Sequence, residues 1–189
     1  MIITHLHPDH WDADAIALLD KNLPVICPAH IAATVTAYGF TNVRAIDSSL
    51  NFKGVQLSLT PGKHGTGEIG EKMGMVNGFV LSSGSESIYV AGDTIWCDDV
   101  RATIEKYRPQ YIAVAGGAAT FDTGDPVTMT TGHIGMLCTA FPEIHVLVTH
   151  LEAISTCTEN RKCIRRKIAG RNFYDRCHIP EDGETLYLH

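Results

Sequence analysis

The chain has 189 residues, of which 44% are hydrophobic and 19% are charged. This length and composition predict a single globular domain over residues 1–189 and exclude a disordered or collagen-like chain. The formal net charge is −6, so neither nucleic acid nor an anionic membrane surface is an expected partner. The basic cluster in residues 161–167 is interpreted as the solvated face of a helix.

Targeting signals and cysteine usage predict a cytoplasmic protein. No apolar run reaches the roughly 18 residues needed to cross a bilayer, and the first residues lack the basic and long apolar regions of a signal peptide. Six cysteines are scattered without a C-x-x-C pair, which is typical of reduced, mostly buried thiols. Ten histidines are many for this length.

Hydrophobic periodicity and turn residues predict alternating strands and helices. In chain order, we expect a strand end at residues 2–4, a helix at 12–20, a strand at 24–27, a helix at 29–38, strands at 43–47 and 55–60, and a glycine-rich loop at 61–67. A hairpin of 75–82 and 87–91 follows, then a helix at 98–107, a strand at 111–115, a helix at 131–141, a strand at 145–149, a helix at 158–169 and a closing strand at 185–189. This order predicts an α/β layered domain with mixed sheets.

The strongest chemical signal is the sequence Thr-His-Leu-His-Pro-Asp-His at residues 4–10. Four metal-capable side chains follow a predicted strand directly: His5, His7, Asp9 and His10. In an extended chain His5 and His7 point the same way, and a turn after them returns Asp9 and His10 on the other side. One loop can therefore offer ligands to two neighbouring metals. Imidazole and carboxylate ligands suit zinc, with manganese and iron as alternatives.

Three further residues occupy loops after predicted strands: His64, Asp93 and His150. Taken singly, each has a structural interpretation. His64 fits a surface loop, Asp93 fits an Asx-turn, and His150 fits the end of a strand. Their shared position after strands favours a role as ligands.

This order of residues resembles the ligand signature of the metallo-β-lactamase superfamily, with H-x-H-x-D-H at residues 5–10 followed by His64, Asp93 and His150. The spacing of the last three is similar to the subgroup that contains phosphosugar lactonases and N-acyl-phosphatidylethanolamine phospholipase D. The resemblance implies a four-layer αββα sandwich. It also implies that the domain is N-terminally incomplete, because the family places β-hairpins before its histidine cluster. An open strand edge would then favour a homo-oligomer.

The resemblance further implies a metal-dependent hydrolase with two zinc ions. His5, His7 and His64 would bind the first metal, and Asp9, His10 and His150 the second. Asp93 would bridge the two metals, and Asp9 would also hydrogen-bond a hydroxide that the metals share. The expected reaction is hydrolysis of a small ester, lactone or phosphodiester. The alternatives are a thioester hydrolase of the glyoxalase II type and a truncated, non-catalytic metal-binding protein.

Four other features allow more than one interpretation. His133 either faces the site or lies on the surface at a helix start, and Trp96 either walls the pocket or packs in the core. Gly116 and Gly117 either let substrate approach the backbone or form a plain turn. Cys97 is near Asp93 in the sequence, but nothing beside it predicts a thiolate.

Overall fold

The computed structural model describes residues 1–187. In chain order its elements are α1 (Ala13–Leu18), β1 (Val25–Pro28), α2 (Ala29–Ala37), β2 (Val43–Ile46), β3 (Ser49–Phe52), β4 (Val55–Pro61), α3 (Gly67–Met73) and β5 (Asn77–Ser83). They continue with β6 (Glu86–Val90), α4 (Asp98–Tyr107), β7 (Tyr111–Ala115), α5 (Thr131–Ala140), β8 (His145–Thr149), α6 (Arg161–Ile168), the 3-10 helix η1 (Tyr174–Arg176) and β9 (Cys177–His178). No helix among the described residues has the length and apolar character needed to span a membrane.

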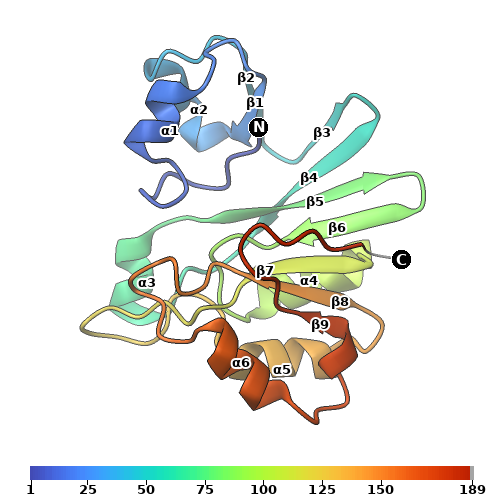
Figure 1. Ribbon diagram of the computed structural model, residues 1–189. Helices are drawn as coiled ribbons and strands as arrows, with labels where there is room; N and C mark the ends of the chain where they lie inside the picture. The colour runs from blue at the N-terminus through green and yellow to red at the C-terminus, as the bar shows by residue number, and fades with distance from the viewer. Residues whose placement is uncertain (188–189) are drawn as a thin grey trace.

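Two sheets lie between two layers of helices (Figure 1). α1 and α2 cover a small sheet, in which β1 and β2 are parallel. The large sheet has seven strands in the order β3-β4-β5-β6-β7-β8-β9, antiparallel from β3 to β6 and parallel from β6 to β9. α4, α5 and α6 cover its other face. The predicted αββα sandwich with mixed sheets is confirmed.

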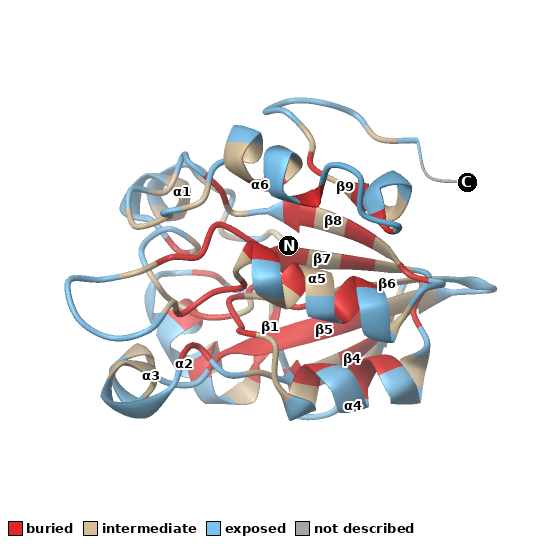
Figure 2. Cartoon of the chain, turned by 90° about the horizontal axis from the view of Figure 1, so that it is seen from below, coloured by how far each residue is buried: buried red, intermediate tan, exposed pale blue. Residues whose placement is uncertain are grey.

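Three hydrophobic cores fill the three interfaces between these layers. β1 is buried along its whole length because its side chains alternate between two cores. Val25 packs with Val35 of α2, whereas Ile26 packs with Phe79 of the large sheet. The largest core lies under α4, α5 and α6, where Figure 2 shows the strands buried beneath the helices. Each buried aliphatic side chain contributes about 1.5–3 kcal/mol to these interfaces.

Several elements differ from the sequence predictions. The sequence does not predict β3 or α3. β3 is short and pairs only with β4, so its local pattern for a strand is weak. α3 contains glycines, which disfavour a helix. Residues 2–4 form a single bridge, between Ile2 and Ile26. α6 begins three residues later than predicted because the side chain of Asn160 caps it, accepting from Cys163 N at 2.8 Å.

The closing strand predicted at 185–189 is wrong for residues 185–187, which belong to no strand. β9 instead pairs with β8 in the large sheet, and Tyr187 is 82% exposed. Apolar alternation predicts a strand only where a partner strand is available. Residues 188 and 189 lie outside the described residues.

Strand direction brings the loops after β4, β6 and β8 to one edge of the large sheet. β6, β7 and β8 are parallel neighbours, so their carboxyl ends meet there. β4 runs in the same direction as β6, because both are antiparallel to β5. The loops after β4, β6 and β8 carry His64, Asp93 and His150. This edge is on the left in Figure 1, below the N-terminal loop.

Candidate metal centre

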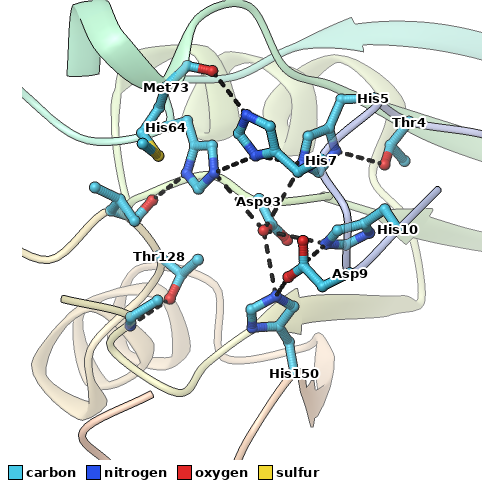
Figure 3. A network of polar contacts seen from close by, with 12 residues as sticks. Thr4, His5, His7, Asp9, His10, His64, Met73, Asp93, Thr128 and His150 are labelled. Atoms are coloured by element: carbon cyan, nitrogen blue, oxygen red, sulfur yellow. Dashed lines mark hydrogen bonds and ion pairs between the residues drawn. The ribbon is translucent and has the colours of Figure 1, made fainter. Parts of the chain in front are cut away.

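The histidine-rich N-terminal loop turns back on itself after His7. The backbone N–H groups of His10 and Trp11 both donate to His7 O, at 2.9 Å each. The Trp11 ring is buried in the core beneath α1 and α2 and anchors the turn. As the spacing predicts, His5 and His7 lie beside each other, with ring centroids 4.5 Å apart, and Asp9 lies on the other side with His10 (Figure 3).

A first group consists of His5, His7 and His64, whose inward nitrogens all lie within 4.8 Å of one another. His7 Nδ1 is 3.1 Å from His5 Nε2 and 3.2 Å from His64 Nε2. Burial, and after it the neighbouring His10, lowers the pKa of His5 to about 3. Burial also lowers the pKa of His64, although its hydrogen bond to Val127 opposes that shift. His5 and His64 are therefore neutral near pH 7, which is the form of imidazole that can bind a metal.

Backbone carbonyls fix the orientation of two of these rings. His64 Nδ1 lies 2.9 Å from Val127 O, and His7 Nε2 lies 3.1 Å from Met73 O. A carbonyl only accepts, so each neutral ring carries its proton on this outer nitrogen. His7 Nδ1 and His64 Nε2 then face each other with lone pairs at 3.2 Å. Such a contact is stable only with a cation or a proton between the two nitrogens.

A second group consists of Asp9, His10, Asp93 and His150. His150 Nε2 lies 3.0 Å from Asp9 Oδ2 and 3.3 Å from Asp93 Oδ2. His10 Nε2 lies 3.2 Å from Asp93 Oδ2, but within the described residues this buried nitrogen makes no hydrogen bond, and neither does Asp93 Oδ1. Buried polar atoms without hydrogen bonds are rare in folded proteins. Their presence here fits a cation bound by this group.

Asp93 lies between the two groups. Besides its contacts with His10 and His150, its Oδ2 is 3.9 Å from His5 Nε2 and 3.8 Å from His64 Nε2. Burial opposes its negative charge, but the imidazoles of His10 and His150 outweigh burial and hold the pKa of Asp93 below its ordinary value. For His150 burial lowers the pKa, yet the interactions with Asp93 and Cys157 together outweigh it and raise the pKa to about 11.

The loop that carries His150 is closely packed against the end of β7. His150 has a φ of 57°, a conformation that costs a non-glycine residue about 1–2 kcal/mol. A Cβ on Gly117 would lie 2.5 Å from His150 O and 2.4 Å from Cys157 Sγ. Gly117 therefore makes room for the His150 loop. This use differs from both the substrate approach and the plain turn that the sequence suggests.

Comparisons with known proteins agree with this geometry. A family model described as the beta-lactamase superfamily domain matches residues 1–151. The chain belongs to the metallo-β-lactamase superfamily. The UPF0173 protein YddR of Bacillus subtilis is 35% identical over 189 residues, a match that covers 98% of this chain and 74% of the relative.

Two solved structures are similar to this superfamily member over nearly its whole length. A possible metal-dependent hydrolase from Veillonella parvula has a TM-score of 0.94 and 32% identity, covering 99% of this chain and 75% of that one. An isothiocyanate hydrolase from Delia radicum gut bacteria has a TM-score of 0.92 and 28% identity, covering 98% and 76%. Further UPF0173 relatives bear the name metal-dependent hydrolase. The protein is a metal-dependent hydrolase of the metallo-β-lactamase fold.

Both groups open into a cavity of about 440 Å³. The same cavity has an apolar wall formed by Met73, Ala119, Phe121, Val127 and Ile154. Trp96 does not line it. Trp96 packs against the core under the helices and lines a separate cavity of about 760 Å³, so its structural interpretation is the right one.

His133 also lies away from the site, at the start of α5. Its backbone N–H donates to Thr130 Oγ1 at 3.1 Å, and its Nδ1 accepts from Thr130 N at 3.4 Å. These two bonds form a capping box, a role that an imidazole can fill in place of the usual carboxylate or amide. The structural interpretation of His133 is thus the right one.

Four residues that the sequence does not single out contact the site histidines. Met73 and Val127 act through backbone carbonyls, which leave no signal in a sequence. Thr4 Oγ1 lies 3.0 Å from His5 Nδ1, and its position beside the motif is the only hint of this contact. Cys157 Sγ lies 3.5 Å from His150 Nδ1. Cys97, which is closer to Asp93 in the sequence, instead packs at the edge of the core under the helices.

Proposed function

We propose that this chain hydrolyses a small ester, lactone or phosphodiester with a dinuclear zinc centre, for which manganese and iron are the alternatives. His5, His7 and His64 would hold one ion, Asp9, His10 and His150 the other, and Asp93 would contact both. The observation that carries the proposal is the 3.2 Å separation of His7 Nδ1 from His64 Nε2, with a backbone carbonyl against the outer nitrogen of each ring. The outer hydrogen bonds to carbonyls are the arrangement that orients metal-binding histidines in proteins.

The two carboxylates have different environments and would have different roles. When bound, the two cations would lower the pKa of a water that they share toward about 7 and polarise the substrate oxygen. The Asp93 side chain is 4% exposed and would keep the two ligand groups at a fixed separation. The Asp9 side chain is 29% exposed and lines the cavity, so it would accept a hydrogen bond from the attacking water.

Metal analysis tests the ligand assignment. After mild dialysis, we expect about two transition-metal ions per chain, because seven ligand-type residues form two groups. His7→Ala and His10→Ala should each reduce the content toward about one ion. His30→Ala is the matched control, because His30 is exposed and belongs to neither group. A protein that contains no metal, and regains none from added zinc or manganese, would contradict the proposal.

Metal uptake should also release a proton from His150. Its pKa of about 11 means that the ring is protonated at pH 7 in the metal-free chain, so a metal must displace that proton. The affinity of the second group should therefore rise with pH between about 7 and 10. His5, with a pKa of about 3, has no proton to lose in this range.

Titration calorimetry in buffers of different ionisation enthalpy measures this release. As the second group fills, we expect His150→Gln to release about one proton per chain fewer than the wild type, because a proton lost by metal-bound water is common to both. Equal proton release by the wild type and the variant would show that His150 is not the proton source.

Turnover separates this proposal from its alternatives. The panel contains a carboxylic ester, a lactone, a phosphodiester and a thioester, and it includes an isothiocyanate because of the similar isothiocyanate hydrolase. A clear preference for the thioester would favour the glyoxalase II type. Metal binding without turnover of any compound would favour a non-catalytic metal-binding protein.

A further inference from the structure

We infer that the non-reacting part of the substrate is a small, uncharged, apolar group that packs against the apolar wall of the cavity beside the metal-binding groups. This inference rests on the proposed function, because it assumes that the reacting group binds at the two ligand groups. It goes further by stating what the rest of the cavity recognises. Three features of the cavity carry it, namely its apolar wall, the absence of lysine and arginine from the described residues that line it, and its volume.

The wall is apolar and includes an exposed aromatic ring. Val127 and Ile154 line the cavity, and Phe121 lines it while remaining 42% exposed. Exposed apolar surface that adjoins a cavity indicates a binding site for an apolar group. Binding such a group would remove the Phe121 ring and the half-buried Ile154 side chain from water, which is favourable in proportion to the apolar area buried.

No lysine or arginine lies among the described residues that line this cavity. Lys63 and Lys72 adjoin His64 and Met73 in the sequence, but both are exposed and neither lines it. An anionic substrate tail would therefore lose hydration without gaining a partner, which is costly.

The loop that carries Phe121 is acidic. Asp122 and Asp125 are both exposed, and Asp125 Oδ2 accepts a hydrogen bond from Thr66 Oγ1 at 3.4 Å. This bond brings the acidic loop next to the start of α3, close to the His64 loop. The carboxylates would repel an anionic tail that approaches from this side.

The basic side chains gather in a different cavity. Arg101, Lys167 and Arg171 line the cavity of about 760 Å³ among α4, α5 and α6. The cavity beside the metal-binding groups has about 440 Å³, within the range of small-molecule sites, so it suits a compact ligand. Charge and volume together point to a small neutral tail.

Two chelators with the same metal-binding head test this directly on the zinc-loaded full chain. Hexanohydroxamic acid carries an apolar tail, and adipic monohydroxamic acid carries a tail of equal carbon number that ends in a carboxylate. By calorimetry we expect the apolar compound to bind at least about tenfold more tightly. Phe121→Arg should bring this ratio close to one or reverse it, because it places a cation on the wall. Since Phe121 is exposed, the change should not disturb the core.

Met136→Arg is the matched control, because Met136 is exposed on α5 and lines the other cavity. It should keep the tenfold preference, and Ile154→Lys provides a second test of the wall. Equal affinities in the wild type, or tighter binding of the anionic compound, would overturn the inference and leave the metal centre intact. If neither compound binds and acetohydroxamic acid, the head alone, does not bind either, the metal centre and the inference both fail.

Discussion

Replacing Asp93 by asparagine should lower kcat/KM by at least about 1,000-fold, equivalent to about 4 kcal/mol of transition-state stabilisation. Asp93 Oδ2 lies within 4 Å of imidazole nitrogens from both groups, so one atom links them. Asparagine removes the negative charge that would hold two cations together. When its amide nitrogen takes the Oδ2 position, a donor replaces the acceptor. The measurement is steady-state turnover of whichever ester, lactone or phosphodiester the wild type accepts.

Asp98→Asn is the control for the Asp93 variant. Asp98 is exposed in the first turn of α4, five residues further along the chain, and the same change there should leave turnover near the wild-type value. Circular dichroism and thermal melting should show that both variants fold. Near-normal turnover by Asp93→Asn would contradict the assignment of Asp93 to both metals.

Replacing Gly117 by alanine should reduce both stability and activity, although Gly117 bears no side chain. The added Cβ would lie 2.5 Å from His150 O and 2.4 Å from Cys157 Sγ. Because His150 O is a backbone atom, the whole His150 loop must move. Overpacking of this kind costs about 1–3 kcal/mol. A shift of about 1 Å in a catalytic group can cost about 100-fold in rate, so kcat and the metal content should fall together.

Gly132→Ala is the matched control for this change. Gly132 lies in the first turn of α5, where the nearest atom to an added Cβ is Thr130 Oγ1 at 3.4 Å. Alanine is about 1 kcal/mol more favourable than glycine inside a helix. We therefore expect a melting temperature equal to or above that of the wild type, with unchanged activity. If the Gly117 and Gly132 variants behave alike in melting and turnover, close packing at Gly117 is not what positions His150.

The sequence by itself determined the fold class, the superfamily and most of the elements. Residues 98–107, 111–115 and 145–149 have the predicted bounds, because their apolar spacing matches both the element and its burial in one core. The seven ligand-type residues were predictable because each lies in the N-terminal motif or directly after a strand. Parallel strands end at a common edge, so local position along the chain is enough to bring these residues near one another.

Only the tertiary structure decided how those side chains are held. The carbonyls of Met73 and Val127 select which nitrogen of His7 and His64 faces inward, and a carbonyl is the same in every residue. The role of Gly117 appears only when the His150 loop packs against it. The role of His133 also appears only in the structure, where it caps α5 and takes no part in the site. The predicted strand at 185–189 is wrong for residues 185–187 for a related reason. Strand pairing, like side-chain orientation, depends on which distant segments become neighbours, and local sequence does not encode that.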